Sequence, residues 1–101
     1  MKTISQRPNK IKKEFIQLLD YHIRKLEQLV KIDRKHAHEL KYMLRALQGS
    51  RGYFRTEDIT LAAIKDCMET IKAGQGNGDK LPIQEEILQE MGLFKLRFGL
   101  V

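Results

Sequence analysis

The chain has 101 residues, of which 42% are hydrophobic and 32% charged, and its net charge is +6. This length supports one modest core, so we expect a single domain over residues 1–101. No apolar run approaches the ~20 residues that span a bilayer, and no secretory signal follows Met1, which predicts a cytoplasmic protein without a membrane contact. The single cysteine, Cys67, rules out an intramolecular disulfide and a multi-cysteine zinc site.

The first half of the chain predicts a helical hairpin. Residues 1–9 are polar and contain Pro8, and we expect them to form a flexible, irregular lead-in. Between residues 10 and 48 there is no glycine or proline, and apolar residues recur with the period of an α-helix. Asp33 interrupts the apolar stripe and is a good helix N-cap, which favours a break near residues 31–34. The alternative is one helix about 57 Å long, which would imply a dimer.

Residues 47–59, with the sequence LQGSRGYFRTEDI, are predicted to connect the second helix to a third. Gly49 stands where a glycine that ends a helix belongs. Thr56 precedes two acids, which is the pattern of a helix N-cap followed by a first turn. We expect Tyr53 and Phe54 to fold back together as an apolar plug where the two helices meet.

The last third of the chain predicts a linker and a short fourth helix. The third helix is expected to end at Gly74, and residues 74–81 form a glycine-rich linker. Pro82 suits the first turn of the next helix, and Gly92 is expected to close it. Residues 93–101 alternate between apolar and basic types and are predicted to be a short strand or an extended tail. The predicted fold is therefore all-α, a small bundle of three to four helices.

Neither a metal site nor a catalytic site is predicted. His36 and His38 would point about 160° apart on a helix and cannot share an ion. His22 lies alone inside an apolar stripe, and we expect it to be a satisfied, partly buried histidine at a helix contact, paired with Asp33 or a backbone carbonyl, with a pH-sensitive interface as the alternative. Cys67 is interpreted as a small core residue. The motifs of nucleophilic hydrolases, phosphate loops and zinc proteases are missing from the sequence, so we expect a non-enzymatic protein without a cofactor.

Basic residues interleaved with tyrosines are the strongest functional signal. Residues 1–35 carry ten lysines and arginines against four acids, so this third of the chain holds a charge of +6. Exposed tyrosines among cations are suited to phosphate contact and base stacking, and equally to a protein interface. The candidate binding residues are Lys10, Lys13, Tyr21, Arg24, Lys31, Arg34, Lys35, Tyr42, Arg45, Arg51 and Arg55.

These features predict a small regulatory or adaptor protein that binds an acidic protein or a nucleoprotein complex through basic helix faces. We expect it to form a homodimer or a higher oligomer. Two alternatives remain at this point. The N-terminal basic helix could bind DNA or RNA directly, or tyrosine and cationic side chains could capture a small nucleotide or another phosphorylated ligand.

Overall fold

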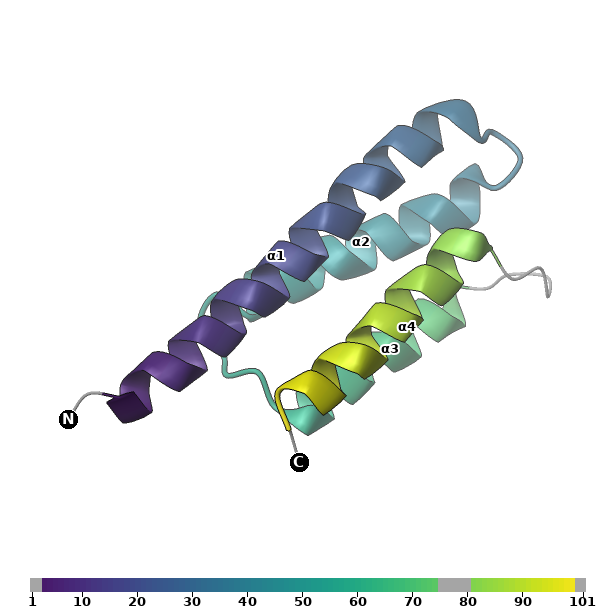
Figure 1. Cartoon of the computed structure of the whole chain (residues 1–101). Helices are drawn as coiled ribbons and strands as arrows, with labels where there is room; N and C mark the ends of the chain where they lie inside the picture. Colours follow the sequence, from purple (N-terminus) through teal and green to yellow (C-terminus); the bar gives the residue numbers. More distant parts are fainter. Residues whose placement is uncertain (1–2, 75–80, 100–101) are drawn as a thin grey trace.

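The computed structural model describes residues 3–74 and 81–99, with side chains from Asn9 onward, and no strand occurs in these ranges. The prediction of an all-α bundle is therefore confirmed. The first two helices form one antiparallel hairpin and the last two form a second hairpin beside it (Figure 1). The bundle is elongated and measures 53 × 22 × 18 Å. The four helices are α1 (Thr3–Ile32), α2 (Ala37–Tyr53), α3 (Leu61–Ala73) and α4 (Pro82–Arg97).

The predicted break between the first two helices is confirmed, and the single long helix is excluded. The carboxylate of Asp33 accepts a hydrogen bond from the backbone N–H of His36 (3.2 Å) and contacts the Nδ1 atom of its ring (2.9 Å). These hydrogen bonds lower the pKa of Asp33. His36 holds the N-cap position of α2, while Asp33 closes the turn that precedes it. A short polar residue able to bond the local backbone therefore stops α1 and starts the turn.

The prediction of an irregular lead-in over residues 1–9 is wrong from Thr3 onward, because α1 already begins there. Pro8 lies within the helix and lacks the N–H that would bond to Ile4. The loss of one hydrogen bond near the start of a helix does not end it when a long segment propagates the helix behind it. That segment is anchored by its apolar stripe, in which Phe15 and Leu26 are fully buried.

Two glycines that were expected to end helices lie inside them. Helix α2 continues through Gly49 to Tyr53, and α4 continues through Gly92 to Arg97. The segment from residue 93 to residue 97, predicted as a strand or extended tail, is therefore helical. A glycine in a helix costs about 1 kcal/mol relative to alanine. Each of these extensions leads to a buried phenylalanine, whose burial contributes about 1.5–3 kcal/mol and outweighs that cost.

The N-cap of α3 is Thr60, and the prediction of Thr56 is wrong. Thr60 has an extended backbone, and its Oγ1 atom accepts a hydrogen bond from the N–H of Ala63 at 3.1 Å. Thr56 is exposed in the loop, as are Glu57 and the acid that follows it, so neither acid lies in the first turn of the helix. Both threonines are competent caps. The choice between them depends on where α3 docks on the core, which the local sequence does not determine.

Three phenylalanine rings at the centre of the core join the two hairpins. Phe15 of α1 meets Phe54, the C-cap residue of α2, with ring centroids 5.2 Å apart, and meets Phe94 of α4 at 5.0 Å. Both pairs are edge-to-face, the arrangement that aromatic rings prefer. The expectation of a plug formed by two aromatics is half confirmed, since Phe54 is buried while Tyr53 is 54% exposed.

The ends of the predicted linker over residues 74–81 belong to the core. Gly74 is the C-cap of α3, and Leu81 is the N-cap of α4 and is buried. Residues 75–80 of that linker lie outside the described part of the chain. Gln84 joins the two helix ends, because its Nε2 atom donates a buried hydrogen bond of 2.8 Å to the carbonyl of Ile71. Among the described residues, no helix combines the length and the apolar character needed to cross a membrane.

Candidate functional site

The outward face of α1 carries a line of exposed cations. The helical period places Lys13, Arg24 and Lys31 within about 20° of one another around the helix axis, and all three are exposed. Lys10 lies beside this line, and two more exposed cations follow in the loop at the end of the helix. We call this set the basic stripe: Lys10, Lys13, Arg24, Lys31, Arg34 and Lys35.

Most of the acids near the basic stripe have partners elsewhere in the molecule. Of the five acids between residues 10 and 40, two form ion pairs with arginines and a third is hydrogen-bonded to a histidine. Glu14 pairs with Arg97 of α4, Asp20 pairs with Arg51 of α2, and Asp33 contacts its neighbouring histidine. No cation of the stripe lies within ion-pair distance of an acid in residues 9–74 or 81–99. The stripe therefore keeps its positive charge available to a partner.

The two tyrosines predicted to lie among cations have contacts of their own. The ring of Tyr42 packs over Gly74, where an added Cβ atom would lie only 2.6 Å from its Cδ1 atom. The ring of Tyr21 is 52% exposed, with the His22 ring 5.1 Å away and the ammonium of Lys25 at 5.3 Å from its centroid. Tyr42 therefore serves the packing of α2 on α3, and Tyr21 covers one side of a buried histidine.

The remaining predicted arginines divide into one paired and two exposed residues. Arg51 binds Asp20 through its Nε atom and ties the end of α2 to α1. Arg45 of α2 and Arg55, in the loop after α2, are exposed. The ion pair with Asp20 argues against Arg51 as part of a binding surface, because a guanidinium that already binds a carboxylate has less charge to offer a partner.

A second polar feature, which the sequence analysis does not predict, runs between α1 and α4. Three polar pairs, two of them ion pairs and one a contact between a histidine and a glutamate, cross this contact in antiparallel order. We call them the α1–α4 seam: Glu14–Arg97, His22–Glu90 and Lys25–Glu86. The seam connects helices that otherwise pack mainly on their own hairpin partners. Polar side chains therefore add to the contact that Phe15 and Phe94 make between α1 and α4.

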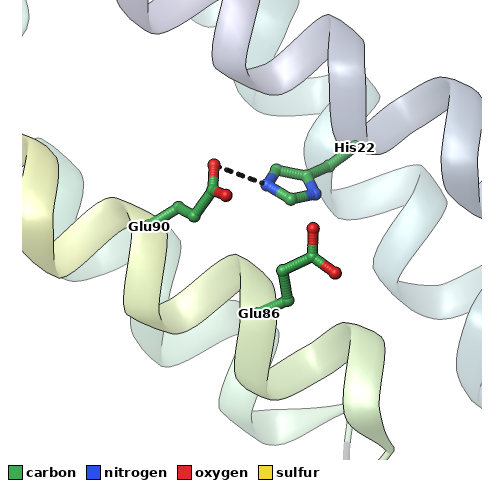
Figure 2. Close-up of side chains that lie close together, drawn as sticks. All are labelled: His22, Glu86 and Glu90. Carbon is green, nitrogen blue, oxygen red and sulfur yellow. Dashed lines mark ion pairs between the residues drawn. The ribbon is translucent and has the colours of Figure 1, made fainter.

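His22 is the fully buried member of this seam. Its Nε2 atom lies 3.4 Å from Oε1 of Glu90 (Figure 2), whereas the expected partner Asp33 binds a different histidine. Neither ring nitrogen of His22 has a well-formed hydrogen bond. Burial lowers the pKa of His22, and the carboxylates of Glu90 and Glu86 offset part of this effect. Burial thus favours the neutral imidazole, which keeps a lone pair on one nitrogen.

The two glutamates that face His22 are four residues apart on α4 and therefore share one face of that helix. Lys25 holds Glu86 through both carboxylate oxygens, at 2.9 and 3.0 Å, and this hydrogen bonding raises the pKa of Lys25. One potential ligand atom from each of His22, Glu86 and Glu90 lies within 4.8 Å of the other two. The geometry thus brings an imidazole and two carboxylates together at the surface of the bundle.

Cys67 behaves as the core residue that the sequence predicts. It is buried, and its Sγ atom lies 2.8 Å from Oγ of Ser50 on α2. Burial raises the pKa of this thiol, the opposite of what a nucleophilic cysteine needs. Cys67 and Ser50 line a hollow of about 400 Å³ between α2 and α3, together with small side chains such as Ala63.

Capture of a small nucleotide finds little support in the shape of the surface. A hollow of about 400 Å³ between α1 and α4 contains Arg97 but no tyrosine. The hollow between α2 and α3 contains Tyr53 but no lysine or arginine. A shallow hollow beside Lys10 and Lys13 contains no aromatic residue. None of these three hollows combines a tyrosine with a lysine or an arginine, which is the pairing that the nucleotide hypothesis requires.

Sequence reasoning finds the basic stripe because exposure on a helix follows from its period. It misses the group formed by His22, Glu86 and Glu90, because the two glutamates are more than sixty residues away from the histidine in the sequence. Within the sequence of α4 alone, they have the pattern of a solvent-exposed helix face. The signal that could have indicated the group is a histidine inside an apolar stripe together with two glutamates spaced by one helical turn. No known family model, curated protein or solved structure matches this chain.

Proposed function

We propose that this chain is a small, non-enzymatic regulatory or adaptor protein of the cytoplasm that binds an acidic protein through its basic stripe. One observation carries the proposal: the stripe cations are exposed and unpaired in the described structure, while Glu14 and Asp20, two nearby acids, are paired with arginines of other helices. The exposed Glu27 lies between Arg24 and Lys31, but the six cations of the stripe keep a net positive charge, which attracts an acidic surface and fixes its orientation on contact.

The spacing of the stripe favours a protein over a nucleic acid as the partner. Lys13, Arg24 and Lys31 are separated by about 16 Å and about 10 Å along the axis of α1. Single carboxylates on a facing helix can meet cations at such intervals. Double-stranded DNA carries one charge per about 1.7 Å of its axis and is usually bound by denser sets of cations. The ring of Tyr42 is also partly covered by Gly74, which reduces the surface on which a base could stack.

Formation of a homodimer or a higher oligomer stays a prediction. The argument for a dimer depended partly on one long N-terminal helix, and the hairpin formed by α1 and α2 removes that part of the argument. The proposed contact through the basic stripe needs only one copy of the chain.

A site-specific crosslink on the stripe tests the proposal. A photoreactive phenylalanine analogue replaces Gln28, which is exposed on α1 between Arg24 and Lys31. After irradiation in native cells, we expect a protein adduct that is lost in the double variant R24E/K31E. The charge-matched control is K65E/K72E on α3, which also lowers the net charge by four and leaves the stripe intact. This control should retain the adduct.

Both variants should keep the circular dichroism spectrum and melting temperature of the parent chain, because the four substituted side chains are exposed. An adduct that survives R24E/K31E would contradict the proposal. A nuclease-sensitive adduct would support direct nucleic-acid binding instead. That outcome would be checked by affinity for mixed-sequence oligonucleotides, which falls steeply with salt when phosphates are neutralised by cations.

A further inference from the structure

The group formed by His22, Glu86 and Glu90 has the composition of a metal site. Imidazole nitrogen and carboxylate oxygen are common ligands of zinc and related divalent ions. Figure 2 shows both carboxylates, carried by α4, turned toward the imidazole of α1. The side chain of His22 is completely buried, while those of Glu86 and Glu90 are 34% and 44% exposed. The group therefore has a fixed, dry ligand on one side and mobile ligands within reach of water on the other.

The unsatisfied ring of His22 is an independent indication of a missing partner. Both of its nitrogens are buried without a well-formed hydrogen bond, and the 3.4 Å separation from Glu90 is longer than the usual 2.9–3.0 Å. Buried polar atoms in native proteins are nearly always satisfied, by protein, water or a bound ion. An ion held between the ring and the carboxylates would satisfy one of these nitrogens directly.

The distances agree with a first-row divalent ion. In a tetrahedral zinc site with bonds of about 2.1 Å, neighbouring ligand atoms lie about 3.4 Å apart. The Nε2 atom of His22 and the Oε1 atom of Glu90 are separated by 3.4 Å. The three potential ligand atoms lie within 4.8 Å of one another, so Glu86 needs to approach by about 1.4 Å at most. Rotation of a partly exposed glutamate side chain accomplishes such a shift.

We propose that His22, Glu86 and Glu90 bind one Zn²⁺ ion, or a closely related divalent transition-metal ion, that links α1 to α4. Two carboxylates and a neutral imidazole balance the charge of a divalent ion. Water completes the coordination, because the two glutamates are open to solvent. The site is independent of the basic stripe and of its proposed partner, since it uses none of the stripe residues.

Lys25 provides an internal competitor for the ion. Its ammonium group neutralises Glu86 in the metal-free protein, and metal binding requires Glu86 to release it. The side chain of Lys25 is 38% exposed and can turn into water when it is displaced. Removal of this ammonium should therefore strengthen metal binding, whereas an incidental pair of surface carboxylates would have no such competitor.

The test uses the full chain freed of metal by a chelator and titrated with Zn²⁺ by calorimetry. We expect one ion per chain. Long-range ¹H–¹⁵N spectra of the histidine rings should show a shift of a His22 nitrogen, with His36 and His38 unchanged. The variant E90Q removes a ligand and should weaken binding by about tenfold or more, since loss even of a supporting group costs 10–100-fold. The variant K25M should tighten binding, and its matched control K65M, at an exposed lysine of α3, should leave it unchanged.

E90Q keeps His22 in place and alters a partly exposed side chain, so its circular dichroism spectrum should match that of the parent chain. H38Q serves as the control for histidines elsewhere and should bind like the parent. The proposal is overturned if folded E90Q binds Zn²⁺ as tightly as the parent. It is also overturned if the spectral shift falls on His36 or His38 instead of His22, or if the parent chain takes up no zinc at all.

Discussion

Substitution of Gly74 by alanine should destabilise the parent protein but stabilise a variant that lacks the Tyr42 ring. Gly74 caps α3 with backbone angles of φ −81° and ψ 8°, which an alanine adopts without strain. Its lack of a side chain matters for another reason: the Tyr42 ring occupies the space where a Cβ atom would be, at 2.6 Å from Cδ1. The two residues are therefore coupled by volume and not by backbone conformation.

The expected free-energy changes follow from these distances. Carbon atoms normally approach to about 3.5 Å, so the added methyl group would overlap the ring by about 0.9 Å and force it outward. Overpacking of this kind costs about 1–3 kcal/mol. Alanine restores about 0.4–1 kcal/mol by restricting the unfolded chain. We therefore expect G74A to destabilise the protein by about 0.5–2 kcal/mol, which lowers the melting temperature by about 4–8 °C per kcal/mol.

In the Y42A background the nearest remaining atom is the carbonyl oxygen of Ile71, at an ordinary contact distance of 3.4 Å. G74A should then raise the stability by about 0.4–1 kcal/mol. Urea unfolding of the parent chain, both single variants and the double variant, followed by circular dichroism, measures the coupling energy. If G74A raised the stability in both backgrounds, the Tyr42 ring could not occupy the space beside Gly74. The ring would then be available for contact with a partner.

Two other predictions concern α3. Substitution T60A should lower the free energy of unfolding by about 0.5–2 kcal/mol through loss of the N-cap, whereas T56A should change it by less than about 0.5 kcal/mol. Urea unfolding measures both changes, and equal effects would contradict the assignment of the cap to Thr60. Because burial raises the pKa of the Cys67 thiol, it should react slowly with Ellman's reagent at pH 8 in the folded protein and rapidly in urea. Rapid reaction of the folded chain would show that the contact between α2 and α3 opens readily.

The buried faces of the helices could be predicted from the sequence, because helical periodicity directly reflects which side chains leave water. Phe15 and Leu40 belong to the segment between residues 10 and 48 in which apolar residues recur with a helical period, and both are buried. The break at Asp33 could be predicted for a similarly local reason, since its carboxylate bonds to the backbone three residues away. Features that depend only on residues nearby in the sequence could therefore be predicted.

The continuation of α2 through Gly49 and of α4 through Gly92 could not be predicted, because a glycine changes helix stability by only about 1 kcal/mol. A single tertiary contact, such as the burial of Phe54 or Phe94, outweighs it. The partners of His22 could not be predicted from the sequence for the same reason. They come from a helix whose rotation about its own axis is set by packing, and no local pattern near residue 22 indicates which side chains α4 will present.

The ring of Phe15 also has a consequence for the order of folding. Helices that are adjacent in the sequence form each hairpin. The contact of Phe15 with Phe54 lies within the first hairpin, whereas its contact with Phe94 joins the two hairpins. The entropy cost of closing a loop rises with its length, so the hairpins can assemble before Phe15 meets Phe94. Proteins dominated by local helical contacts fold within microseconds to milliseconds. Docking of two preformed hairpins around one aromatic ring is thus the step that completes the native core and makes unfolding cooperative.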